Sequence, residues 1–463
     1  MPELDFKGKE FVRNHHLTVP FRPLIPDPSK SIGEPDLDGN LVIHGDNLEA
    51  LKSLLPMYAG KVDCIFIDPP YNTGNEGWSY NDNVNSPILK AWFSENPVGL
   101  DDTLRHDKWC AMMWPRLRLL WELLAPGGSI WITLDDNEAA AARLILDELF
   151  TESNFIATIV WHKMDSPKNT AQFFSEDHDY ILVYAKNKPD LNIGLVPRTE
   201  QMIARYQNPD GDPRGPWLLG DLAARNFYSQ GLYEIVTPSG RRIAGPPSGS
   251  YWRVSEAKLR ALDEDNRLYY GPNGDSRPGL KRFLSEVREG VVPQTIWHWE
   301  EVGSTRNAKQ GLQPILAKEG EQEIFITPKP VQLVEKVLQL CTTPDSIILD
   351  SFAGSGTTGH AVLRANTRDG GSRRFILVEC EEYADSLTAE RVRRVINGYP
   401  FKGTQRETLY EQKLNFSSLK RADELLADAT NVAELNNGAF DKIETKVEAG
   451  VLRVTGIRSV DEM

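Results

Sequence analysis

The apolar residues recur with two different spacings between residues 40 and 186 of the chain. Short apolar runs predict buried strands, and stretches in which apolar residues repeat every three or four positions predict helices. The predicted strands are residues 40–44, 62–67, 129–134, 155–161 and 180–185. The predicted helices are residues 48–55, 107–124 and 137–150. Strands that alternate with helices through short Gly and Pro turns are typical of a mostly parallel α/β sheet.

This alternation stops after Lys186 and resumes near Val331. Residues 187–324 are rich in Gly and Pro and contain only short apolar runs, which is typical of a separate module of short strands and loops. The elements predicted after it are a helix at residues 331–341, a strand at residues 346–349, a helix from Thr357 and a strand at residues 374–378. One sheet interrupted by an inserted module is the simplest interpretation.

Both ends of the chain depart from the pattern. The first 39 residues are charged and rich in Pro, which predicts a wrapping arm that contributes no core element. Near the other end, residues 419–426 are helix-like, and residues 442–447 and 451–457 are strand-like. The predicted divisions are residues 1–39, 40–186, 187–324, 325–403 and 404–463.

Composition narrows the class of protein. At about 100–200 residues per domain, 463 residues predict two or three domains. No apolar window reaches the length of a membrane span, and the first residues do not resemble a signal peptide, so we expect a cytoplasmic protein that does not enter a membrane. The four Cys lie far apart, and no His or carboxylate spacing indicates a metal site. A net charge of −14, averaged over the chain, argues against nucleic acid as partner.

A glycine-rich turn follows the strand at residues 346–349. It runs from Asp350 to Gly359 and opens a helix, so its backbone can approach a ligand closely and the first free N–H groups of the helix can bind it. Such a turn fits either a nucleotide-like cofactor or tight packing. Glu379, at the end of the next strand, favours the cofactor, because a carboxylate there accepts hydrogen bonds from ribose hydroxyls. A nucleotide-dependent oxidoreductase would use the same turn.

A second motif, Asp68-Pro69-Pro70-Tyr71, follows the strand at residues 62–67 directly. The two prolines stiffen the turn and remove N–H donors, so the Asp68 carboxylate and the Pro69 carbonyl can both accept from one planar amino group. The Tyr71 ring can stack on the heterocycle that bears this group. The motif therefore fits the exocyclic amine of a base taken out of its helix. The alternative is a rigid turn with a capping Asp and a core Tyr.

Together these two motifs resemble those of the amino-directed DNA methyltransferases. That family combines a (D/N/S)PP(Y/F/W) loop with an FxGxG loop, which are present here as Asp68 to Tyr71 and Phe352 to Gly356. The order of the two motifs, with a module between them, resembles the β class. Residues 135–138 and 161–186 resemble the modification subunits of type III restriction systems. The similarity covers about residues 40–400.

The resemblance implies a Rossmann-like S-adenosylmethionine-dependent sheet with an inserted target-recognition domain and a C-terminal extension. The implied catalytic residues are Asp68, Pro69, Pro70 and Tyr71. The implied cofactor site comprises Asp46, Asp68, Thr327, Lys329, Pro330, Asp350, Phe352, Ala353, Gly354, Ser355, Gly356, Thr357, Thr358 and Glu379. Within the inserted module, which contains thirteen Arg, the candidates for DNA contact are Arg241, Arg242, Lys281, Arg282, Arg306 and Lys309. The other reading of this Arg-rich surface is a lid or a dimerisation domain.

The implied reaction is site-specific methylation of the N6 amine of adenine in double-stranded DNA, by base flipping and direct in-line transfer. DPPY loops in this family mostly accompany N6-adenine methylation. The alternatives within the same chemistry are N4-cytosine methylation and methyl transfer to RNA or to a protein amide. An oxidoreductase and a catalytically idle DNA-binding regulator are alternatives from other classes. The implied partners are DNA, a second copy in a homodimer or higher homo-oligomer, and a restriction subunit as an open question. The scattered Cys need no catalytic role, and Cys64 is expected in the core.

Overall fold

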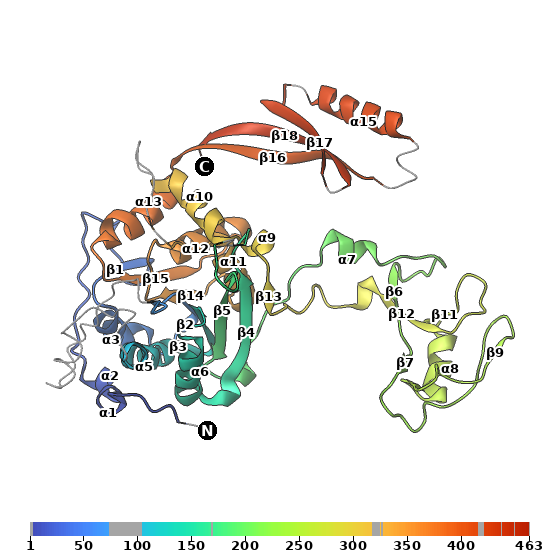
Figure 1. The fold of residues 1–463 in the computed structure, drawn as a ribbon, viewed down its shortest axis with the longest axis horizontal. Coiled ribbons are helices and arrows are strands. Elements are labelled where there is room, and N and C mark those ends of the chain that lie inside the picture. Colours follow the sequence, from blue (N-terminus) through green and yellow to red (C-terminus); the bar gives the residue numbers. More distant parts are fainter. Residues whose placement is uncertain are drawn as a thin grey trace. The chain divides into compact units, whose positions relative to one another are not determined.

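The computed structural model describes residues 3–73, 104–167, 170–316, 325, 327–414, 421–436, 438–448 and 450–462. The chain divides into two compact units (Figure 1). The first comprises Met1–Ile193 and Gln294–Met463, and the second comprises Gly194–Pro293. The second unit is thus an insertion between two parts of the first.

The first unit is built on an eight-stranded sheet with the order β1-β15-β14-β2-β3-β5-β4-β13. Its strands are β1 (Leu41–His44), β2 (Val62–Ile67), β3 (Leu124–Leu134), β4 (Phe155–His162), β5 (His178–Ala185), β13 (Ile296–Trp297), β14 (Ile347–Asp350) and β15 (Arg374–Glu379). Among the described strands of this sheet, β5 runs antiparallel to its two neighbours, and all other neighbouring pairs are parallel. The predicted mostly parallel α/β sheet is therefore confirmed, as is its interruption by an inserted module.

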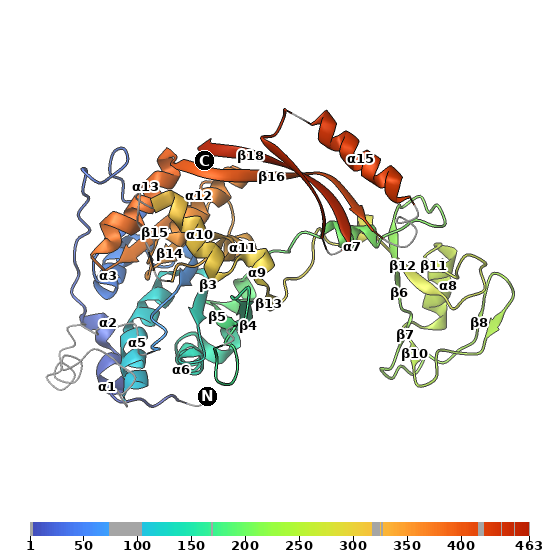
Figure 2. The same ribbon diagram turned by 45° about the horizontal axis from the view of Figure 1, so that its top comes forward.

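Helices cover both faces of this sheet. Figures 1 and 2 show α3, α5 and α6 along one face and α11 and α12 along the other. Between residues 41 and 399, the described helices of this unit are α3 (Asn47–Tyr58), α5 (Arg105–Leu123), α6 (Ala139–Leu146), α9 (Trp299–Val302), α10 (Thr305–Leu316), α11 (Val331–Cys341), α12 (Thr357–Asp369) and α13 (Glu390–Asn397). Short helical turns lie at η1 (Asp147–Thr151), η2 (Glu152–Asn154), η3 (Lys188–Asp190) and η5 (Ala384–Ala389). Because both faces are covered, the apolar residues of β2 are buried whichever way they point.

Most predicted elements agree with the structure, but the start of β3 differs from the predicted start. The predicted strand at residues 129–134 starts five residues earlier, at Leu124, which pairs with Val62 of β2. The sequence Pro126-Gly127-Gly128 is typical of a helix stop, yet it lies within the strand. A Cβ on Gly128 would approach the carbonyl oxygen of Val62 to 2.8 Å, so glycine permits the strand to continue at this point.

The N-terminal arm contributes to the core, contrary to the prediction. Two short helices, α1 (Lys9–Val12) and α2 (His15–Thr18), contact α5. Phe6, Val12 and Val19 are buried in the main core, and the Phe6 ring lies 6.0 Å from that of Trp114. These apolar residues do not form a periodic pattern of their own, so only the surface of α5 identifies them as core residues.

The inserted unit consists of short strands and loops, as predicted. Its elements are α7 (Glu200–Ala204), β6 (Trp217–Gly220), β7 (Ala223–Ala224), β8 (Ile235–Val236), β9 (Arg242–Ile243), β10 (Tyr251–Trp252), α8 (Glu256–Glu264), β11 (Leu268–Tyr269), β12 (Gly279–Phe283) and η4 (Leu284–Glu286). The strands form three small sheets, β11-β12-β6, β10-β7 and β8-β9. Trp252, buried between them, belongs to the unit's own apolar core.

The boundaries of this unit differ from the predicted module at residues 187–324. Residues 294–316 belong to the first unit, because β13 pairs with β4 in the large sheet and α10 contacts α13. Residues 317–324 lie outside the described residues. A two-residue strand such as β13 is too short to give a pattern in the sequence, which explains the difference.

The C-terminal extension forms an antiparallel sheet with the order β16-β18-β17. Its elements are β16 (Pro400–Lys413), α15 (Ala422–Leu435), β17 (Lys442–Glu448) and β18 (Val451–Glu462). The predicted helix-like and strand-like stretches agree with α15, β17 and β18, although residues 419 and 420 lie outside the described residues. The sequence analysis missed β16, and its boundary at residue 404 falls inside this strand.

Candidate active site

Four neighbouring strands bring the predicted motifs to one edge of the large sheet. β1, β15, β14 and β2 lie side by side and run in the same direction. Their carboxyl ends carry, in this order, Asp46, Glu379, the glycine-rich turn and the loop from Asp68 to Tyr71. In parallel α/β sheets, ligands bind at this edge of the strands. The candidate cofactor and catalytic residues, far apart in the sequence, therefore face one site.

The glycine-rich turn is held in shape by Asp350. Its carboxylate accepts hydrogen bonds from the Phe352 N–H at 3.0 Å and from the Thr358 hydroxyl at 2.6 Å. Burial raises the pKa of Asp350 to about 7. Gly354 and Gly356 have φ values of 51° and 75°, a region that favours glycine. We infer that Asp350 holds the turn in shape, and its contact with a cofactor stays a prediction.

Two side chains that follow β15 in the chain, Thr388 and Arg391, donate hydrogen bonds to the glycine-rich turn. The Thr388 hydroxyl donates to the Gly354 carbonyl at 2.5 Å. The Arg391 guanidinium donates to the Ser355 carbonyl at 3.1 Å and to the Thr357 hydroxyl at 2.9 Å. Ala353, Ser355, Thr357 and Thr358 are all buried. The sequence analysis missed Thr388 and Arg391, because neither belongs to a recognisable motif.

Glu379 ends β15 beside this turn. Its carboxylate accepts from the backbone N–H groups of Gly354 at 2.7 Å, Cys380 at 2.9 Å and Glu381 at 3.1 Å. Burial raises the pKa of Glu379, and these N–H donors counteract that shift. Each carboxylate oxygen has two acceptor positions, so Glu379 can still accept from a hydroxyl group of a ligand.

Asp46 lies at the neighbouring strand end and caps α3. Its carboxylate accepts from the Glu49 N–H at 3.0 Å and remains exposed. Arg116 lies 3.7 Å from this carboxylate and also donates to Asn47, whose amide donates to the Ser351 carbonyl at 3.2 Å. This chain of contacts connects the ends of β1 and β14, so the relative position of Asp46 and the glycine-rich turn is fixed.

The Asp68 carboxylate accepts from two donors on different elements. The Thr133 hydroxyl of β3 donates to Oδ1 at 2.5 Å, and the Lys329 ammonium donates to Oδ2. Downstream, the Pro70 carbonyl accepts from the Trp109 ring N–H at 2.7 Å. The loop is thus anchored by α5 and β3, while the side chain of Asp68 stays partly exposed.

Tyr71 lies between Asp68 and a second acidic residue. Its hydroxyl donates to Asp179 Oδ2 at 3.4 Å, and Lys163 donates to Asp179 Oδ1 at 2.5 Å. Burial raises the pKa of Asp179, although the positive charges of Lys163 and Lys329 oppose the shift. Asp179 is the second residue of β5. Because β5 runs antiparallel to its neighbours, its amino end lies at the same edge of the sheet as the carboxyl ends of the parallel strands.

The segment before α11 places Lys329 and Pro330 in the interior, whereas Thr327 is exposed. The Lys329 carbonyl accepts from the Thr357 hydroxyl at 3.2 Å. The same residue therefore contacts the start of α12 through its backbone and the Asp68 carboxylate through its side chain.

A buried carboxylate supports the loop just beyond Tyr71. Asn72 has a φ of 62°, and its side-chain amide donates to Glu138. His106 Nδ1 lies 2.7 Å from the same oxygen, Oε1, of Glu138. Among the described residues, the other oxygen of Glu138 has no hydrogen-bond partner, and burial raises the pKa of this residue to about 7. The sequence analysis noted Glu138 only through the resemblance of residues 135–138.

The predicted DNA contacts separate into three groups. Arg241, Arg242 and Arg282 are exposed on the inserted unit. Arg306 and Lys309 are exposed on α10, which belongs to the first unit, and Arg306 pairs with Asp165 at 2.9 Å. Lys281 does not fit the predicted role, because its side chain is fully buried and pairs with Asp210 at 2.5 Å and Asp212 at 3.1 Å.

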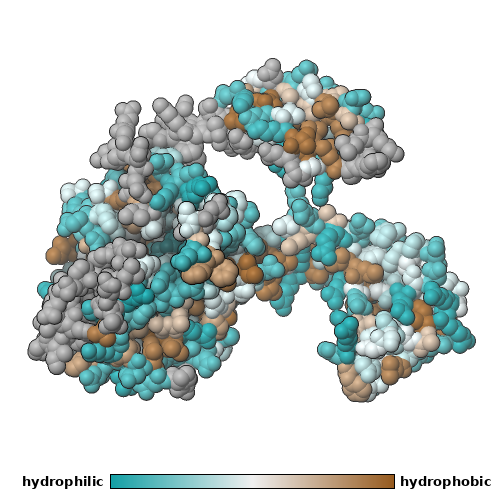
Figure 3. Space-filling model, in the orientation of Figure 1, coloured by the Kyte–Doolittle hydropathy of each residue, from teal (hydrophilic) through white to brown (hydrophobic). Residues whose placement is uncertain are grey.

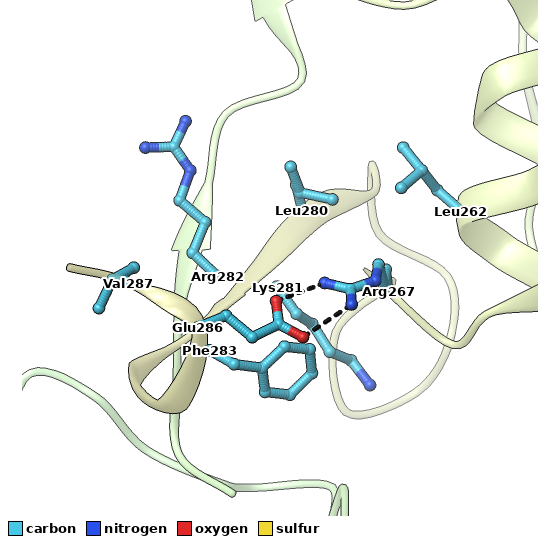
Figure 4. A pocket seen from close by; sticks show the side chains of 8 residues that line it. All are labelled: Leu262, Arg267, Leu280, Lys281, Arg282, Phe283, Glu286 and Val287. Carbon is cyan, nitrogen blue, oxygen red and sulfur yellow. Dashed lines mark hydrogen bonds and ion pairs between the residues drawn. The ribbon is translucent and has the colours of Figure 1, made fainter. Parts of the chain in front are cut away.

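A hollow of about 360 Å³ lies on the inserted unit beside β12. Figure 4 shows Arg267 and Glu286 joined across it, with Arg282 extending away from that pair. The two guanidinium nitrogens of Arg267 each lie 2.7 Å from a carboxylate oxygen of Glu286. The charge of Arg267 is therefore neutralised within the unit, whereas Arg282 is directed outward.

Three further observations concern metal sites, membrane-spanning helices and the cysteines. No cluster of three or more His, Cys, Asp or Glu among the described residues could hold a metal ion. In the same part of the chain, we find no helix with the length and hydropathy of a membrane span. Cys64 is buried in β2, in agreement with the predicted core position, and its sulfur lies 3.2 Å from that of Cys341.

The mostly parallel sheet, with helices on both faces, places the chain in the class of Rossmann-like α/β proteins. A family model described as DNA methylase matches residues 62–390. That match covers most of the chain and includes both motifs. The chain therefore belongs to the DNA methylase family.

Relatives of known name include subunits of restriction-modification enzymes. The chain is 33% identical to the type III restriction-modification enzyme StyLTI Mod subunit of Salmonella typhimurium, over 83% of this chain and 59% of that protein. It is 29% identical to the EcoPI Mod subunit of Escherichia phage P1, over 94% of this chain and 74% of that protein. It is also 29% identical to the type II methyltransferase M.KpnI of Klebsiella pneumoniae, over 76% of this chain and 83% of that protein. The chain thus spans about three fifths of the length of the Salmonella relative.

Proposed function

We propose that this protein transfers a methyl group from S-adenosylmethionine to the N6 amine of adenine in double-stranded DNA. One observation carries the proposal: β14 and β2 are hydrogen-bonded neighbours, so the glycine-rich turn and the Asp68 loop lie at the same edge of the sheet. A cofactor held by the first motif then adjoins an amine held by the second. Membership of the DNA methylase family supports this assignment.

The residues at the glycine-rich turn fit a nucleoside cofactor. A Cβ on Gly354 would approach the Phe325 ring to 3.3 Å, so glycine lets this ring pack closely against the turn. Glu379 offers a carboxylate to ribose hydroxyls, and the exposed Asp46 carboxylate lies at the adjacent strand end. Bound there, S-adenosylmethionine would supply an electrophilic methyl group on a sulfonium. Phe352, half-buried beside the turn, offers an apolar surface to the same ligand.

The chain's own residues would position the nucleophile. The amine of adenine is a weak nucleophile because its lone pair is delocalised into the ring. Hydrogen bonds from the amine to Asp68 and to the Pro69 carbonyl would favour a pyramidal nitrogen, and Tyr71 would stack on the flipped base. In the transfer, the nitrogen lone pair would form the new bond to the methyl carbon as the sulfur–carbon bond breaks. The electrons of that bond would stay on the sulfur of the departing thioether, and the proton lost by the amine would pass to solvent. Such a reaction depends mainly on positioning, and it requires no covalent intermediate.

Adenine is the preferred base because the loop begins with Asp68, as in the adenine-directed members that the motif resembles. N4-cytosine methylation uses the same chemistry and remains the second candidate. An oxidoreductase is disfavoured, because it leaves the Asp68 loop without a role at the same edge of the sheet.

DNA and a second copy of the chain are the proposed partners. The inserted unit would read DNA, since it contains fourteen Lys and Arg against twelve Asp and Glu, whereas the whole chain has a net charge of −14. Figure 3 shows apolar residues gathered over the C-terminal extension, where Leu426, Leu435 and Val447 are more than half exposed. We propose this surface for self-association. The Mod-subunit relatives support a restriction subunit as a further proposed partner.

The test is transfer of a labelled methyl group to genomic DNA, followed by digestion and separation of the modified nucleosides. We expect N6-methyladenine, and sequencing of the methylated sites will give the recognition sequence. Asp68→Ala should abolish transfer while calorimetry still shows S-adenosylmethionine binding. Asp136→Ala, an exposed acid at the same edge, is the matched control and should retain turnover. Label only in N4-methylcytosine would select the second candidate, and no label in DNA would reject both.

A further inference from the structure

We propose that the Lys329 ammonium occupies the position of the target amine in the free protein, and that it must leave Asp68 before that amine can bind the carboxylate. Lys329 would thus be a positioning residue that keeps the catalytic carboxylate paired until the substrate arrives. This inference rests on the proposed function, because it assigns Asp68 to the target amine.

Two contacts of the ammonium, with Asp68 and with the Tyr71 ring, are contacts that the proposed function assigns to the target base. Lys329 donates to Asp68 Oδ2, while Thr133 already occupies Oδ1. The Lys329 nitrogen also lies 4.9 Å from the centre of the Tyr71 ring, a cation–π distance. A flipped base would present its N–H donor to the same carboxylate and its ring to the same aromatic face. The two nitrogens therefore compete for one position.

The surroundings allow the side chain to leave while its backbone stays in place. The Lys329 carbonyl is held by the Thr357 hydroxyl, and prolines precede and follow the residue. A second acceptor is near, because the charge of Lys329 acts on the buried Asp179 carboxylate. Asp179 Oδ2 accepts a long hydrogen bond, of 3.4 Å, from the Tyr71 hydroxyl. We infer that the ammonium turns from Asp68 toward Asp179 when the base enters.

Competition makes a specific prediction about binding. In the wild type, the hydrogen bond gained by the target amine is offset by loss of the Lys329–Asp68 ion pair. DNA with adenine at the target position and DNA with purine, which lacks the amine, should therefore bind with similar affinity. In Lys329→Met the Asp68 carboxylate lacks its ammonium partner, so the adenine duplex should bind about tenfold more tightly than the purine duplex.

The experiment measures the dissociation constants of both duplexes, with the sequence found by the methylation assay, for wild type, Lys329→Met and Lys329→Arg. Cofactor is omitted, so that a loss of cofactor contacts does not affect the result. Lys329→Arg keeps a donor on Asp68. This variant, like the wild type, should bind the adenine duplex and the purine duplex with similar dissociation constants. A role of Lys329 in folding alone would weaken both duplexes equally.

The inference would be overturned if Lys329→Met bound the two duplexes with the same relative affinity as the wild type does. It would also be overturned if the wild type itself bound the adenine duplex much more tightly than the purine duplex. Either result would leave the proposed function intact, provided that the wild type methylates adenine. If the wild type does not methylate DNA, the proposed function itself fails. The two failures are therefore distinguished by the methylation assay that precedes the binding measurements.

Discussion

At the scale of single residues, environment separates the carboxylates at the site into different roles. Asp68 is partly exposed and paired with Lys329, so it can accept a new donor once that pair opens. Asp350 is buried with its oxygens occupied by the turn, and Glu379 receives backbone N–H groups while bordering the cofactor site. The same functional group thus serves the reaction, the shape of the turn and the ligand, according to what surrounds it.

Glu138 gives a prediction about pH at this scale. Burial raises its pKa to about 7 in the folded protein, from an ordinary value of 4.5. Between these two pH values the folded state binds more protons at Glu138 than the unfolded state does. The free energy of unfolding should therefore fall as the pH rises through this window, on the order of 3 kcal/mol in total.

Glu138→Gln should remove this part of the pH dependence, because the amide stays neutral and can still accept from Asn72. Urea unfolding at pH 5, 6, 7 and 8 measures it. Glu152→Gln, an exposed substitution in the same region of sequence, should follow the wild-type curve. Parallel curves for Glu138→Gln and wild type would show that Glu138 titrates normally.

At the scale of elements, η5 and α13 act as a support for the glycine-rich turn. Arg391 of α13 is buried, and no carboxylate among the described residues pairs with it. Burial lowers its pKa to about 9, and its two terminal nitrogens contact Ser355, Thr357 and the His360 ring, whereas its Nε has no hydrogen-bond partner among the described residues. An unpaired buried charge is costly, so its retention at this place is consistent with a role in fixing the turn.

Arg391→Met should therefore weaken S-adenosylmethionine binding by about tenfold, through loss of the hydrogen bonds that fix the turn. Calorimetry measures the dissociation constant. Arg393→Met on the same helix is the matched control, because Arg393 pairs with Glu390 and does not contact the turn. Equal affinities for wild type and Arg391→Met would show that the turn holds its shape without this support.

At the scale of the whole molecule, charge is divided between the two compact units. The inserted unit has a net charge of +2, so the other residues together have −16. An average over the chain therefore conceals a weakly basic unit in which twelve of the fourteen cationic residues are Arg. DNA binding that depends on such a local surface should be strongly dependent on salt.

The double variant Arg241→Ala/Arg242→Ala should weaken DNA binding and reduce its salt dependence while the dissociation constant for S-adenosylmethionine stays unchanged. Fluorescence anisotropy at several salt concentrations measures the DNA affinity. Arg260→Ala is the control: Arg260 is exposed on the same unit and pairs with Glu256 within α8. Unchanged DNA affinity at low salt in the double variant would remove these two residues from the proposed contacts.

Local patterns along the chain were enough to predict the sheet, its interruption by a module and the two motifs. These features depend on local periods and short segments, such as the strand at residues 62–67 that leads into Asp68, and neighbouring residues in the chain specify them. The arm was misjudged for the opposite reason, because Phe6 and Val12 become core residues only through contact with α5.

Tertiary structure alone decided which groups meet at the candidate site. Lys329 and Thr133 reach Asp68, Arg391 reaches Ser355, and Lys281 turns inward to Asp210. These partners come from elements separated in the chain by tens to hundreds of residues. The order of the strands and the packing of the helices bring these partners together. Neither can be read from a local pattern in the sequence, so the spacing of residues could indicate a site but could not give its contacts.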